Sequence, residues 1–174
     1  MTTSAVNTKK LFTSLDETWS ELVNLISSTN GESINAVPFK DCWTIAQLAT
    51  HVTKSNKAIA QGMEMEGKPA EREPDAGEPD IRKIFLDFDV KYKSPQFIVP
   101  EDKSYNHGEV LKILNSSIDK LKALRSKADL VEIIDLPIFG KVTKLELLYF
   151  VLYHTQRHIY QLNKMFSALK RKQA

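Results

Sequence analysis

The sequence has a single cysteine, Cys42, among its 174 residues, so no disulfide can form within the chain. Disulfides are rare in the reducing cytoplasm, and a chain without one fits that compartment. The first ten residues also lack an apolar stretch of the kind that forms a secretion signal. We therefore expect a cytoplasmic protein.

A marked charge of one sign is also absent. The 24 lysines and arginines nearly balance the 22 aspartates and glutamates, which leaves a formal net charge of +2. This balance gives no reason to expect a nucleic acid or a membrane as partner. The strongest apolar run, residues 145–153, is too short to span a bilayer and is interrupted by Glu146. With 42% hydrophobic residues and no internal repeat, residues 1–174 are expected to form one globular domain.

Four segments have apolar residues three or four positions apart, the spacing of an amphipathic helix. Three of them begin with residue pairs that can form a capping box. These pairs are Thr44 with Gln47, Asn106 with Glu109, and Thr143 with Glu146. The expected helices cover about residues 6–28, 44–63, 106–124 and 143–170. The prediction is an all-α protein, a four-helix bundle.

The segment between the second and third helices, residues 64–105, contains five prolines and many charges. We expect a loop there, with a short helix at about residues 80–89. A connection of this length can span the bundle, so the second and third helices can run parallel. The predicted topology is therefore up-down-down-up. Residues 130–140 are expected to form an extended stretch or a small hairpin.

Two of the four histidines, His154 and His158, lie four residues apart on the last predicted helix. This spacing places both imidazoles on one helical face, where two nitrogens can converge on a single metal ion. His51 lies at the margin of the apolar stripe of the second helix and could join them in a groove between the two helices. Periodicity alone favours a partly exposed boundary residue at His51.

Two segments resemble motifs of the DinB/YfiT-like superfamily. Residues 43–52, WTIAQLATHV, resemble its second-helix motif, and residues 154–162, HTQRHIYQL, resemble its last-helix motif. The resemblance covers about residues 11–169. It implies an up-down-down-up bundle and one divalent metal ion held by His51, His154 and His158. Zinc or nickel is the expected ion, with iron, manganese and copper as alternatives, because imidazole suits several of these metals.

The resemblance also implies a class of activity. Some superfamily members transfer bacillithiol, mycothiol or glutathione, and others are mycothiol-dependent isomerases. Three imidazoles leave one position of a tetrahedral ion open, as catalytic sites do. We therefore expect a metal-dependent enzyme that transfers a small thiol to an electrophilic substrate. The alternatives are a metal-dependent hydrolase and a non-catalytic protein, either a metal-stabilised bundle or a stress protein that binds a partner.

No catalytic base or nucleophile is identified from the sequence. Gln161, three residues after His158, is the candidate to orient that ligand through a hydrogen bond. The other candidates are expected to have structural or surface roles: Glu146 as a helix cap, Arg157 as a solvated side chain, His107 as a surface residue or a fourth ligand, Cys42 as a packing residue and Trp43 as a core anchor.

A tyrosine-rich stripe lies beside the core face of the last helix. Its residues are spaced four, three and four apart: Tyr149, Tyr153, Gln156 and Tyr160. A neighbouring long helix or the 130–140 segment could cover these rings. The alternative is a homodimer that packs this face against its copy, since tyrosine is enriched at interfaces.

Overall fold

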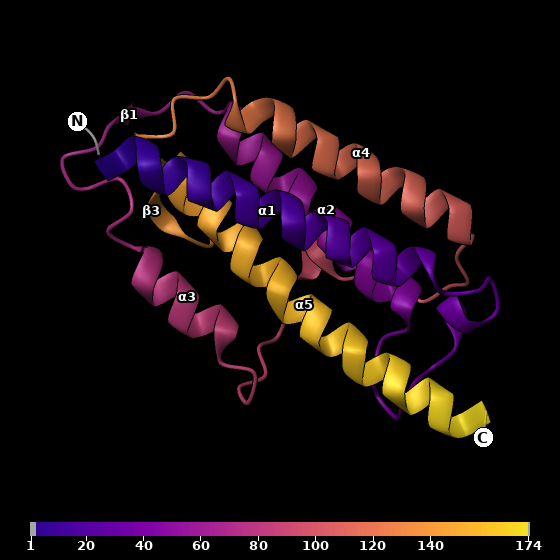
Figure 1. The fold of residues 1–174 in the computed structure, drawn as a ribbon. Helices are drawn as coiled ribbons and strands as arrows, with labels where there is room; N and C mark the ends of the chain where they lie inside the picture. The colour runs from indigo at the N-terminus through magenta and orange to yellow at the C-terminus, as the bar shows by residue number, and fades with distance from the viewer. Residues whose placement is uncertain (1–2, 174) are drawn as a thin grey trace.

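A computed structural model describes residues 3–173, and four long helices form its main body (Figure 1). They are α1 (Thr3–Ser27), α2 (Ile45–Glu64), α4 (His107–Arg125) and α5 (Lys144–Gln173). Helices α1 and α5 run in one direction, and α2 and α4 run in the other (Figure 1). The predicted up-down-down-up bundle is therefore confirmed.

The helix starts follow from local hydrogen bonds. At α2 the Gln47 N–H donates to Thr44 Oγ1 (3.2 Å), while the Thr44 N–H donates to Gln47 Oε1 (2.9 Å). Thr143 and Glu146 form the same reciprocal pair at the start of α5. At α4 the Glu109 N–H donates to Asn106 Oδ1. Each cap satisfies backbone donors that a helix end leaves unpaired, which fixes where the helix begins.

The long connection between α2 and α4 contains three short elements: β1 (Lys68–Pro69), α3 (Glu78–Leu86) and the 3-10 helix η2 (Gln96–Ile98). A further 3-10 helix, η1 (Ser33–Asn35), precedes α2. Strands β2 (Glu132–Leu136) and β3 (Gly140–Thr143) form the predicted hairpin, with Ile134 opposite Val142. Strand β1 adds to β2 and completes an antiparallel sheet in the order β1-β2-β3.

The core lies between the four long helices. It is built from the apolar positions that helical spacing predicts, so each helix contributes one buried stripe. The largest side chains in it include Trp19 and Leu22 of α1, Ile45 of α2, Leu114 of α4 and Leu148 of α5. The crossover, residues 65–106 between α2 and α4, adds to this core: Ile81, Phe85 and Leu86 of α3 are partly buried and pack against it.

The Glu146 carboxylate fastens the crossover to the start of α5. Its side chain is 1% exposed, and its two oxygens accept hydrogen bonds from both terminal nitrogens of Arg72, each at 2.6 Å. The Gly77 and Thr143 N–H groups donate to the same carboxylate. Burial alone would raise the pKa of Glu146, but these donors hold it below its usual value. A Cβ at Gly77 would lie 2.7 Å from Glu146 Oε1, so a side chain there would push the carboxylate out of this position.

The tyrosine stripe of α5 is covered by the crossover. The Tyr153 hydroxyl donates to Glu78 of α3, and the Tyr160 ring stacks on Phe88 with a centroid distance of 4.2 Å. Figure 1 shows α3 lying along α5. The observed cover therefore includes α3 and the residues that follow it, a segment that the sequence did not suggest for this role. This packing accounts for the stripe within one chain, and the homodimer stays a prediction.

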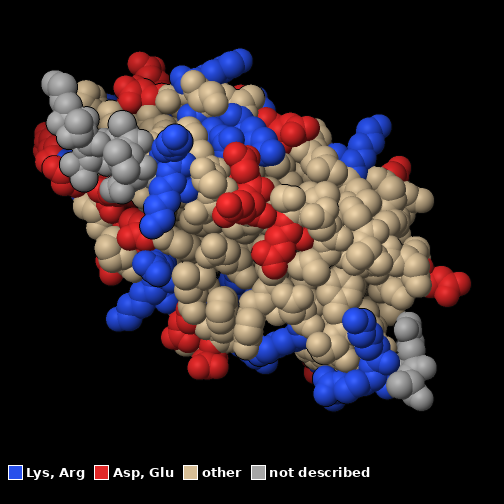
Figure 2. Space-filling model, viewed as in Figure 1, with Lys and Arg blue, Asp and Glu red and all other residues tan. Residues whose placement is uncertain are grey.

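Lysine and arginine side chains alternate with aspartate and glutamate on the face of the molecule in Figure 2. This distribution agrees with the near balance of the two charges in the sequence. Within residues 3–173 the helices are too short or too polar to cross a membrane.

We predict that Glu146→Gln lowers the free energy of unfolding by about 2 kcal/mol, because it leaves Arg72 unpaired and turns an amide group toward hydrogen-bond donors. Denaturation in urea measures this loss. The matched control is Glu64→Gln, since Glu64 forms an exposed ion pair with Lys120. The control should cost less than about 1 kcal/mol. Equal losses in the two variants would contradict the role given to Glu146.

Candidate metal centre

Three histidines from two helices meet inside the bundle. His51 comes from α2, and His154 and His158 come from α5. The His154 Nε2 atom lies 3.2 Å from His51 Nε2 and 3.0 Å from His158 Nε2. The side chains are buried, with 2%, 6% and 6% exposed for His51, His154 and His158. The prediction from periodicity that His51 is partly exposed is therefore wrong, because the crossover covers that margin of α2.

Hydrogen bonds on the far side of two rings fix which nitrogen faces the centre. His51 Nδ1 lies 3.0 Å from the Ile98 carbonyl oxygen, which can only accept. His51 therefore carries its proton on Nδ1, and its neutral ring turns the Nε2 lone pair inward. His158 Nδ1 lies 2.7 Å from Gln161 Oε1, which has the same effect on His158. Partners of this kind are those that orient metal-binding histidines.

The arrangement of the three nitrogens fits a metal ion. The neutral His154 ring can donate at most one hydrogen from Nε2, yet that atom faces two inward lone pairs. Tetrahedral coordination with metal–nitrogen bonds of 2.0–2.1 Å separates the nitrogens by about 3.3 Å. All three ligand atoms lie within 4.8 Å of one another. A divalent ion between them would accept all three lone pairs, whereas the rings alone leave at least one inward lone pair without a donor.

The surroundings keep the three rings neutral. Burial lowers the pKa of His51 and lowers that of His154 well below its usual value. Burial, together with the nearby His51, lowers the pKa of His158 to about 3. Metal binding requires the unprotonated imidazole, so no proton has to be displaced from these side chains at neutral pH.

Aromatic rings form the walls of the centre. Phe150 stacks on His154 with a centroid distance of 4.9 Å, and Phe85 of α3 meets the edge of the same ring at 5.8 Å. The Trp43 ring lies 5.0 Å from the His51 ring. Trp43 is half-buried, so the prediction that it anchors the core is wrong. It is instead a wall of the centre at the start of α2.

Arg157 is buried, whereas the helical spacing predicts a solvated side chain. The residue is only 7% exposed. Its guanidinium donates to the carbonyl oxygens of Phe85, Asp87 and Val90, because α3 and the residues after it lie across this face of α5. The periodicity of the last helix gave no sign of this contact, since the acceptors are backbone atoms of an irregular segment.

His107 and Cys42 lie outside the centre. His107 Nε2 is 3.0 Å from the Ile26 carbonyl oxygen at the end of α1 and does not join the other histidines. Cys42 is half-buried beside the core, and burial raises the pKa of its thiol. A nucleophilic cysteine requires a lowered pKa, so Cys42 is suited to packing.

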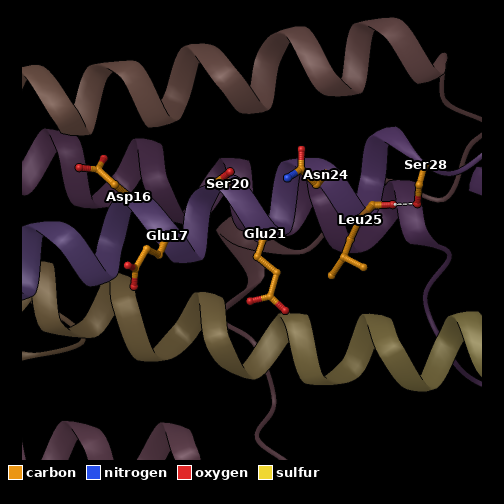
Figure 3. Close-up of a pocket in the computed structure, with 7 residues that line it drawn as sticks. All are labelled: Asp16, Glu17, Ser20, Glu21, Asn24, Leu25 and Ser28. Atoms are coloured by element: carbon orange, nitrogen blue, oxygen red, sulfur yellow. Dashed lines mark hydrogen bonds between the residues drawn. The ribbon is translucent and has the colours of Figure 1, made fainter.

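A surface groove of about 820 Å³ is lined by α1 residues, including Asp16, Glu17 and Glu21, and by Ser28 just after that helix (Figure 3). Asp16 is paired with Arg125 at 2.8 Å, and none of the three histidines lines this groove. A second cavity, about 540 Å³, lies between the start of α2 and residues 100–104, and Trp43 forms part of its wall.

A sequence model of the DinB superfamily matches residues 14–162 of the chain. The chain belongs to the DinB superfamily. The match covers both motifs from which the resemblance was drawn, so that prediction is confirmed. No curated protein sequence matches the chain.

Solved structures agree with the DinB fold. YfiT from Bacillus subtilis, described as a probable metal-dependent hydrolase with an unusual four-helix bundle topology, has a TM-score of 0.59 and 13% identity. The similarity covers 94% of this chain and 87% of YfiT. The four-helix bundle protein TT2238 has a TM-score of 0.57 and 18% identity, covering 90% of this chain and 98% of TT2238. At these identities the similarity establishes the fold.

We predict that the metal-free DinB protein loses stability as the pH falls below about 6.5. The folded-state pKa values of His154 and His158 are lowered, so the unfolded chain binds more protons in the window from about 6.5 down toward 3. Stability should therefore fall by on the order of 1 kcal/mol per histidine between pH 6.5 and pH 5. Chemical denaturation at several pH values measures it, with the double variant His154→Ala, His158→Ala as control. A double variant with the same pH slope as wild type would contradict the prediction.

Proposed function

We propose that this DinB-superfamily protein is a metal-dependent enzyme whose centre is one divalent ion held by His51, His154 and His158. The observation that carries the proposal is the convergence of three buried Nε2 atoms, two of which present lone pairs fixed by Ile98 and Gln161. Imidazole ligands suit several divalent metals, and zinc or nickel is the ion that the superfamily resemblance implies.

The residues around the ion have distinct roles in this proposal. The three histidines hold the ion, the Ile98 carbonyl and Gln161 orient two of the rings, and Phe85, Phe150 and Trp43 exclude water. A divalent ion with three neutral ligands and an open position supplies a nucleophile at neutral pH, by lowering the pKa of a water or thiol that it binds. The aromatic walls strengthen this effect by keeping the local dielectric low.

The contacts of the centre favour a small thiol as the nucleophile. Among residues 8–172 no carboxylate is hydrogen-bonded to any of the three histidines. Hydrolysis commonly uses such a group to move a proton to the leaving group, whereas a thiol reacts once its own proton is lost. We therefore propose transfer of a low-molecular-weight thiol to an electrophile. Hydrolysis is the second candidate, because the similar structure of YfiT is described as a probable metal-dependent hydrolase.

A purely structural ion is the alternative role. Structural zinc sites are normally closed by four protein ligands, and removing the ion unfolds the domain. This centre offers three ligands, and the bundle has an apolar core made by all four long helices. We therefore expect the metal-free protein to stay folded, as a catalytic centre allows.

We predict that protein purified without a polyhistidine tag binds close to one divalent ion per chain. Replacing His51, His154 or His158 with alanine should lower the affinity at least about tenfold, since each removes one of three ligands. Elemental analysis and competition with a chromophoric chelator measure this. His107→Ala is the matched control and should bind as wild type does. Equal occupancy in all these proteins would refute the metal centre.

We further predict that the metal-loaded protein conjugates glutathione or cysteine to a chromogenic electrophile faster than metal-free protein does. Chelation should remove this activity, and added zinc or nickel should restore it while circular dichroism stays unchanged. A parallel assay with activated esters and no thiol tests hydrolysis. If neither reaction has a metal-dependent rate above background, the enzymatic proposal fails and a non-catalytic role takes its place.

A further inference from the structure

The three histidines of the proposed metal centre are almost closed off from solvent. An ion with one open position reacts only with molecules that reach it, yet the three histidines are 2%, 6% and 6% exposed. The walls are packed, since Phe85 and Phe150 lie against each other at 4.9 Å and both contact His154. An entering ion and any larger ligand must therefore displace part of the protein.

One segment of the crossover is suited to move. We define the strap as residues 87–97, which join the end of α3 to η2 and have mostly exposed side chains. The strap begins beside His154, where Phe85 packs, and ends beside His51, where the Ile98 carbonyl accepts from Nδ1. It therefore connects the two sides of the centre. Segments with few buried contacts open at low free-energy cost, whereas the bundle core does not.

Arg157 holds the strap closed. Its guanidinium binds the carbonyl oxygens of Asp87 and Val90 in the strap and of Phe85 just before it. The guanidinium also lies 5.3 Å from the centre of the Tyr92 ring. No carboxylate among the described residues forms an ion pair with Arg157. A buried cation whose hydrogen bonds are made to the carbonyls of one segment keeps these partners only while that segment is in place.

We propose that the strap is a lid over the metal centre, that Arg157 is its latch, and that ligands reach the ion when the strap leaves Arg157. This inference rests on the proposed metal centre and adds its route of access. It makes Arg157 a positioning residue, which acts through the strap rather than by touching the ion.

The test is the rate at which zinc alone enters and leaves. Stopped-flow mixing of metal-free protein with zinc gives the association rate, and mixing zinc-loaded protein with 4-(2-pyridylazo)resorcinol gives the dissociation rate. A lid slows the association and dissociation rates equally. Arg157→Met removes charge-assisted hydrogen bonds to the strap, so it should raise both rates roughly tenfold. Because both rates rise together, Kd should change less than about threefold. Arg157→Lys, which keeps the charge but cannot reach three carbonyls at once, should have an intermediate effect.

Controls separate the latch from a general effect of arginine loss. Arg171→Met removes an exposed arginine of the same helix whose bond is to Ser167, and both rates should stay at wild-type values. If Arg157→Met does not fold, Phe88→Ser removes the stack on Tyr160 and should raise both rates by a smaller factor. Unchanged rates would overturn the proposal. A rise in the dissociation rate alone would also overturn it, because Arg157 would then support the ligands instead of a lid.

Two further outcomes are distinguishable. If Trp43→Ala accelerates zinc exchange and Arg157→Met does not, access is through the cavity at the start of α2 and the lid proposal fails.

If wild type binds no zinc, the metal centre fails, and amide hydrogen exchange of the metal-free chain then tests the strap by itself. Exchange at residues 85–92 should rise at least about fivefold in Arg157→Met, with α2 and α4 unchanged. Unchanged exchange there would overturn the latch.

Discussion

Three imidazole nitrogens that face one another inside an apolar wall are the constraint on which the rest of this site depends. A histidine pair on one helix is common, but a third ring aimed at the same point from another helix leaves lone pairs that hydrogen bonds alone cannot satisfy. Keeping these rings neutral and unsatisfied costs free energy, which the bundle core offsets. A bound divalent ion would remove that cost. Because α2 carries His51 and α5 carries the other two histidines, the packing of these helices determines whether the proposed chemistry is possible.

The crossover contacts this centre at both of its ends. Its α3 end is attached to α5 by polar groups spaced along one helical face: Glu146, Tyr153 and Arg157. Its η2 end supplies the carbonyl that orients His51. The crossover thus orients one of the proposed metal ligands and shields another, and none of the three proposed ligands comes from the crossover itself. Between these two ends lies the strap, whose side chains are mostly exposed. It can move without disturbing the core, which makes it the part of the molecule suited to control access.

The sequence predicts those features that local physics determines. Helix caps and apolar spacing place α2, α4 and α5, and the shared face of His154 and His158 follows from one helical turn. Periodicity alone misplaced His51, because its burial depends on a distant segment, and only the superfamily resemblance grouped it with the other two. Arg157 could not be predicted for a related reason: its partners are carbonyls of irregular backbone, which leave no pattern of side chains. Strand β1 was missed because two residues, Lys68 and Pro69, are too short for any periodicity.

The most direct test of the central claim is X-ray absorption spectroscopy at the metal edge, on protein reconstituted with one equivalent of zinc or nickel. Our account predicts three nitrogen neighbours with imidazole multiple scattering, at about 2.0–2.1 Å for zinc, and a further light-atom ligand in the open position. The imidazole contribution should fall by about one third when His51 is replaced by alanine. A spectrum dominated by oxygen or sulfur neighbours, or one unchanged by that replacement, would contradict it.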